Sequence, residues 1–179
     1  MKMRVPVCLA LAACFAPLVL AQTIANPITS TVRSVMAESQ KNMVAAAEAM
    51  PAAKYAYKPT PQQMTFRHLI KHATMANYFF CSKLTGAGMP AAAKGVMQGA
   101  PAKAVLISRL KDSYAYCASQ FAHETDTGLG EPVHLFGPHE FSRGGGMLIM
   151  TDDWTDHYSI AASYLRLNGI LPPTARGHK

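Results

Sequence analysis

Two polar residues in the last third of the chain, Asp153 and His157, have the types and the spacing to do metal chemistry. They lie four positions apart, so on a helix they point toward the same spot. That side of the predicted helix otherwise carries apolar residues such as Met150, Trp154 and Ala161. An unpaired carboxylate among apolar side chains is costly, on the order of several kcal/mol. Both residues therefore need a partner.

Two explanations satisfy this requirement. Asp153 and His157 could hydrogen-bond to each other as a structural pair, or both could bind a metal ion together with a residue from another helix. An earlier segment offers His68 and His72, which are again four positions apart. The helical wheel puts His72 at the border of the apolar side that contains Leu69, while His68 lies further out. We therefore predict His72 as the third metal ligand and His68 as a surface or supporting residue.

A site with two imidazoles and one carboxylate is typical of open zinc and non-haem iron centres. Three protein ligands leave a coordination position for water or for a small-molecule substrate. A divalent metal ion there, whether zinc, nickel, manganese or iron, could lower the pKa of a bound water or thiol. The sequence contains no other catalytic motif: we find no nucleophile elbow, no H-E-x-x-H zinc motif and no dinucleotide-binding glycine pattern.

Four long segments with helical periodicity must position these residues, and no window alternates convincingly as a strand does. We predict helices over residues 26–50, 60–84, 101–123 and 146–168. Asn26 and Thr60 are the predicted N-caps of the first two helices, and Gly86 ends the second. The polar connection 125–145 is expected to be a loop, with the glycine run 144–146 as a flexible hinge. The predicted fold is all-α, a four-helix bundle with its site between helices.

The N-terminus predicts export. Lys2 and Arg4 precede an apolar run over residues 5–20, and Ala21 fits a cleavage site, so residues 1–21 are the predicted signal peptide. The run is too short for a confident membrane span. Residues 22–179 then form a single domain, located in the periplasm or secreted. A lipoprotein processed at Cys14 is the minor alternative.

The cysteines agree with an oxidising compartment. Cys8 and Cys14 would leave with the signal peptide, so the exported chain keeps Cys81 and Cys117. Two remaining cysteines in such a compartment predict one disulfide, and two buried free thiols are the alternative.

The charge of the chain gives no sign of nucleic-acid binding. The formal net charge is +7, but the lysines and arginines are scattered rather than gathered in a stripe with aromatic residues. We interpret this charge as a mildly basic, solvated surface.

Two blocks of the sequence resemble a known family. The first covers residues 64–72 and continues through 76–81, and the second covers 156–158 and 164–173. Both resemble the DinB-like superfamily, and the second block is the more specific. The resemblance extends over nearly the whole predicted mature chain.

The resemblance implies a four-helix bundle that holds a divalent metal with three histidines, one from the second helix and two, four residues apart, from the last. His72 and His157 match two of these positions, and Asp153 replaces the third histidine. Relatives of this kind include metal-dependent thiol transferases, a thiol-dependent isomerase and hydrolases. Because low-molecular-weight thiol cofactors are cytosolic, an exported member fits a hydrolase, or a bundle without catalysis, better than a thiol transferase.

Overall fold

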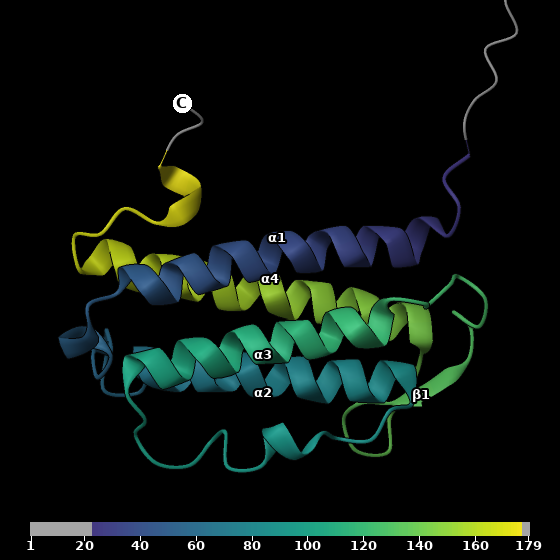
Figure 1. Cartoon of the computed structure of the whole chain (residues 1–179), viewed down its shortest axis with the longest axis horizontal. Coiled ribbons are helices and arrows are strands. Elements are labelled where there is room, and N and C mark those ends of the chain that lie inside the picture. Colours follow the sequence, from purple (N-terminus) through teal and green to yellow (C-terminus); the bar gives the residue numbers. More distant parts are fainter. Residues whose placement is uncertain (1–22, 177–179) are drawn as a thin grey trace, which may run out of the picture.

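Four long helices form a bundle, as predicted (Figure 1). The computed structural model describes residues 23–176, and the helices are α1 (Pro27–Ala49), α2 (Phe66–Thr85), α3 (Lys103–Phe121) and α4 (Arg143–Leu167). Three short 3-10 helices, η1 (Ala52–Lys54), η2 (Ala91–Ala93) and η3 (Pro173–Ala175), lie in the connections and near the C-terminus.

Each long helix packs mainly against two of the other three. Helix α2 packs against α3 and α4, and α1 packs against α4 and α3. The connection between α2 and α3 runs back along the length of the bundle, so these two neighbours are parallel (Figure 1). One continuous core fills the space between the helices. Helix α2 is therefore placed beside α4 over part of its length, which is what a shared site requires.

The first helix begins where expected, but its cap differs from the prediction. Asn26 has a left-handed backbone (φ 52°), and its side chain makes no capping bond to α1. The cap comes from Asp126 instead, whose carboxylate accepts hydrogen bonds from the backbone N–H groups of Ile28 and Thr29, both at 2.9 Å. Asn26 in turn accepts a bond from the Asp126 N–H at 3.0 Å. A distant residue can take over a cap in this way, and the local sequence does not reveal it.

The start of the second helix was predicted wrongly. Thr60 and Gln63 form only a local turn, in which the Gln63 N–H donates to the Thr60 carbonyl at 3.2 Å. Helix α2 begins at Phe66, and its N-cap is Thr65, which accepts from the His68 N–H at 3.1 Å. The Phe66 N–H donates to the Tyr57 carbonyl at 2.9 Å, so a tertiary contact satisfies one of the free helix donors. The predicted end is confirmed, with Gly86 at φ 72°.

The connection before α4 is more ordered than predicted. It contains an antiparallel hairpin of β1 (Pro132–His134) and β2 (Glu140–Ser142), in which Val133 pairs with Phe141. Strands of three residues give no usable alternation in a sequence. Residues 144–146 are not a hinge but lie in the first turn of α4, where Ser142 caps the helix by accepting from the Gly145 N–H at 3.1 Å.

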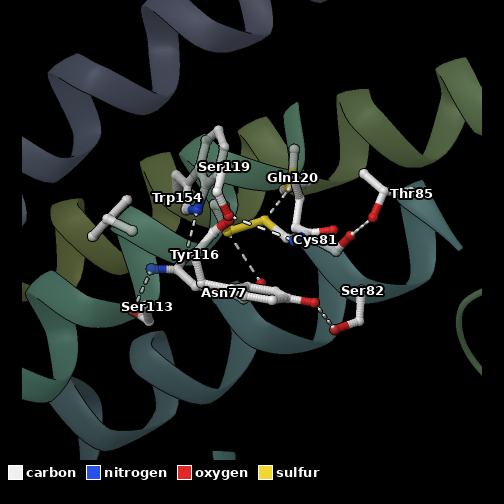
Figure 2. Close-up of a disulfide and its surroundings, with 12 residues drawn as sticks. Asn77, Cys81, Ser82, Thr85, Ser113, Tyr116, Ser119, Gln120 and Trp154 are labelled. Carbon is white, nitrogen blue, oxygen red and sulfur yellow. Dashed lines mark hydrogen bonds between the residues drawn. A yellow bond between two sulfur atoms is a disulfide. The ribbon is translucent and has the colours of Figure 1, made fainter. Parts of the chain in front are cut away.

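Cys81 of α2 and Cys117 of α3 form a buried disulfide, as predicted (Figure 2). Their Cα atoms are 5.3 Å apart, and 36 positions separate them in the sequence. Neither side chain is exposed to solvent. The bridge ties together the two parallel helices that the long connection joins.

Residues 1–22, which include the whole predicted signal peptide and the first residue of the predicted mature chain, lie outside the described part. Among residues 23–176, no helix has both the length and the apolar character needed to cross a membrane.

Candidate metal centre

Helix α4 presents His157 to the core and Asp153 to its edge. The buried residues of this helix recur every three or four positions, from Met147 through Met150 and Trp154 to His157 and Ala161. The His157 side chain is 7% exposed and that of Asp153 24% exposed. The apolar side of α4 therefore does carry an imidazole, with a carboxylate one turn earlier.

Asp153 and His157 approach each other without forming a hydrogen bond. The His157 Nδ1 and Asp153 Oδ2 atoms are 3.1 Å apart, which is close enough for an ion pair if the imidazole is protonated. Among the residues that the structure describes, however, neither atom has a partner with hydrogen-bond geometry, although both atoms are buried. Buried polar atoms without partners are uncommon, because each one costs the loss of its hydration. The two atoms therefore lie close together without a hydrogen bond that satisfies either of them.

His72 of α2 reaches the same place from the opposite helix. Its ring meets the His157 ring edge to face, with 4.9 Å between the ring centroids. The His68 ring stacks on the outer side of His72 at 6.5 Å. Both His68 and His72 are exposed, in contrast to His157. His72 thus lies next to its proposed partner His157, and His68 lies next to His72.

The surroundings of His72 favour the neutral form of its imidazole. Partial burial lowers the pKa of His72 below its usual value, and repulsion from His157 and, more weakly, from His68 lowers it further. The carboxylate of Asp153 acts in the opposite direction but does not outweigh these effects. A neutral imidazole is the form that binds metal ions.

An apolar pocket opens beside these residues. It has a volume of about 250 Å³, and its walls are His72, Met75, Ala76, Phe79, Phe80, Met89, Phe136 and Asp153. Most of these belong to α2, while Asp153 comes from α4, and Phe136 lies between the two strands of the hairpin. We call this cavity the apolar pocket. It leads from solvent to two of the three predicted ligands.

The three predicted ligands are neighbours, but they do not form a finished metal site. Within residues 23–176, no group of three or more His, Cys, Asp or Glu side chains is arranged to hold a metal ion. The structure therefore brings His72, Asp153 and His157 together without pointing their donor atoms at one common position.

The family of the chain follows from its sequence as well as from its shape. The sequence model of the DinB superfamily matches residues 36–161, which include all three candidate ligands. The chain belongs to the DinB superfamily. No curated protein matches the sequence.

Solved structures agree with this DinB superfamily assignment. The crystal structure of a DinB-like protein from Bacillus subtilis is similar to this chain with a TM-score of 0.66 and 16% sequence identity. The similarity covers 83% of this chain and 99% of that protein. At this level of identity the likeness concerns the fold, which is the same four-helix bundle.

The donor set of this DinB superfamily member fits a divalent metal ion in its chemistry. Two imidazoles and a carboxylate suit zinc, nickel, manganese or iron. Asp153 Oδ2 and His157 Nδ1 are buried atoms that lack a hydrogen-bond partner among the described residues. The residues therefore fit such an ion by the types of their donor atoms.

Met89 and Phe136 belong to the walls of the apolar pocket, and helical periodicity does not predict either of them. Both come from connections between helices, and both are 50% exposed. Exposed apolar residues in predicted loops are a weak signal for a pocket, because many loops carry one. Their position opposite α2 depends on the hairpin and on the long connection between α2 and α3.

Proposed function

We propose that this chain is an exported metalloprotein that binds one divalent metal ion with His72, Asp153 and His157. Its activity would be metal-assisted transfer or hydrolysis of a small molecule held in the apolar pocket. The observation that carries the proposal is the pair of buried atoms without hydrogen-bond partners on Asp153 and His157, beside the ring of His72.

The three residues would have different tasks. His157 is held firmly by the core, so it would fix the depth of the ion between the helices. Asp153 would supply the only negative charge of the three and partly neutralise a divalent ion. His72 would complete the set from the solvent side. The chemistry that a divalent ion supplies in such a site is Lewis-acid activation of a coordinated small molecule.

The apolar pocket supports an open site rather than a closed structural one. Its walls include His72 and Asp153, so a small molecule in the pocket would lie against these two residues. The surrounding aromatic and methionine side chains would exclude water from it. Such exclusion strengthens electrostatic interactions inside a site.

Export rests on two separate features. The signal-like N-terminus motivates it, and the buried Cys81–Cys117 disulfide is compatible with an oxidising compartment.

The deciding experiment measures metal directly. We expect elemental analysis of chain purified without chelators to find about one divalent ion per molecule. His157→Ala should lose the ion, whereas the matched variant His134→Ala, which removes an exposed histidine of β1, should keep it. Asp153→His restores the third histidine that the family resemblance implies, and it should bind zinc more tightly. Wild-type protein without any divalent ion would overturn the proposal.

A bundle without metal is the competing function, and two observations favour it. The described residues contain no finished metal group, and the 3.1 Å approach of His157 to Asp153 could serve as a purely structural ion pair. In that case a chelator should leave the melting temperature unchanged. A drop in melting temperature on chelation would exclude this alternative, because only a ligand of the native state stabilises it.

A further inference from the structure

The apolar pocket has an aromatic wall that the three ligands do not explain. Phe136 stacks on Phe79, with 5.8 Å between ring centroids and 26° between the ring planes. Phe136 also meets Phe80 edge to face at 6.0 Å. The wall is thus built from two consecutive residues of α2 and one residue of the hairpin. Aromatic rings contribute binding free energy beyond the area they bury when another ring packs on them.

Two apolar side chains remain exposed at the mouth of this pocket. Phe136 and Met89 are each 50% exposed, although they line the same cavity. An apolar cavity with a few polar groups at one end is the usual form of a small-molecule site. The exposed parts of Phe136 and Met89 are therefore a surface that a ligand can cover.

The pocket is large enough for a ring-sized ligand. A buried apolar cavity of about 150 Å³ accepts a benzene molecule. The apolar pocket measures about 250 Å³, which leaves space for one ring with a short substituent.

The polar end of the pocket selects the charge of the ligand. His72 and Asp153 are its only charged or titratable wall residues. If His72, Asp153 and His157 hold a divalent ion, the single carboxylate leaves the centre with one net positive charge. A centre with net positive charge favours an anionic oxygen donor. Without the ion, Asp153 alone would repel such a group.

We infer that the apolar pocket binds a small aromatic carboxylate, with its ring against Phe79, Phe80 and Phe136 and its carboxylate toward His72 and Asp153. The negative charge of the ligand rests on the proposed function, because the metal ion would attract it. The aromatic ring of the ligand does not, because it follows from the aromatic wall. Phe136 would act as a specificity residue, because it supplies the wall that faces α2.

Phenylacetate and acetate test the inference as a matched pair, since they share a carboxylate and differ in the ring. We expect the zinc-loaded full mature chain to bind phenylacetate at least about tenfold more tightly than acetate, measured by calorimetry. Phe136→Ala should weaken phenylacetate binding by about tenfold and leave acetate binding unchanged. Leu148→Ala, which removes an apolar side chain of α4 that is 64% exposed, should change neither.

An uncharged aromatic ligand tests whether the pocket binds a ring independently of whether the chain binds a metal ion. Benzyl alcohol should bind the chain with and without zinc, and Phe136→Ala should weaken that binding, measured by ligand-observed NMR. If the wild type holds no metal but binds benzyl alcohol through Phe136, the proposed function fails, the carboxylate part of the inference fails with it, and the aromatic site stands. If phenylacetate binds no better than acetate and benzyl alcohol does not bind, the aromatic site itself is overturned.

Discussion

Asn77 is the residue that joins three helices of the bundle through polar contacts. Its side-chain amide donates to the Ser113 hydroxyl at 2.9 Å and accepts from the Trp154 indole N–H at 2.7 Å (Figure 2). All three side chains are buried. Trp154 directly follows Asp153 on α4, so this contact also fixes the turn of α4 that carries the candidate site.

Replacing Asn77 should be costly, because its buried partners would keep their polar groups without a bond. We expect Asn77→Ala to lower the free energy of unfolding by about 2–4 kcal/mol. Trp154 is the only tryptophan, so its fluorescence reports urea unfolding directly. Asn42→Ala removes an exposed amide that bonds to Glu38 at 3.0 Å and should cost less than about 0.5 kcal/mol. Equal midpoints for the two variants would contradict this role of Asn77.

At the scale of elements, the start of α4 depends on a close approach that only glycine permits. A Cβ atom on Gly146 would lie 2.5 Å from Cδ2 of Leu84 and 3.3 Å from Cδ1 of Leu135. Both leucines are buried, so neither can move freely away. A Cβ atom on Gly144 would meet its nearest neighbour, Leu129, only at 3.4 Å. The close packing therefore requires glycine at position 146 but not at position 144, two positions earlier in the same helical turn.

This difference gives a matched pair of variants. Gly146→Ala should destabilise the protein by about 1–3 kcal/mol, because overpacking outweighs the better helix propensity of alanine. Gly144→Ala should leave stability unchanged or raise it by up to about 1 kcal/mol through that propensity. Urea unfolding of both variants at the same pH measures the difference between their free energies of unfolding. If Gly146→Ala were as stable as Gly144→Ala, the contact of α4 with Leu84 would not limit this position.

The disulfide affects the stability of the whole molecule, because it lowers the conformational entropy of the unfolded chain. It closes a loop of 36 positions, for which chain entropy predicts about 4 kcal/mol and engineered bridges give about 2–4 kcal/mol. The double variant Cys81→Ala with Cys117→Ala should therefore melt about 5–15 °C lower. A calorimetric scan measures this shift. An unchanged melting temperature would mean that the bridge adds nothing to stability.

Intact-mass spectrometry is the control for the oxidation state and for processing. The exported chain should have the mass of residues 22–179 less two hydrogen atoms. Two titratable thiols in the unfolded protein would contradict the bridge. A lipid on Cys14 would support the lipoprotein alternative instead.

The regular parts of this protein could be predicted from short stretches of sequence. The spacing of apolar residues predicts the four helices, and Gly86 marks the end of α2 because it adopts a left-handed backbone at no steric cost. The two helix starts show where local patterns fail. Thr60 and Thr65 are both plausible caps, and the choice depends on the bond that the Phe66 N–H donates to the Tyr57 carbonyl and on the path of the chain.

The sequence by itself determined that Asp153 and His157 share one side of α4, because the helical period is a local property. It also predicted the Cys81–Cys117 disulfide, on the expectation that Cys8 and Cys14 belong to a signal peptide. Only the tertiary structure decided that Asp126 caps α1, that His72 packs on His157 and that Phe136 closes the apolar pocket. These contacts join residues far apart in the chain. Their geometry depends on how helices and hairpin pack, which no local pattern records.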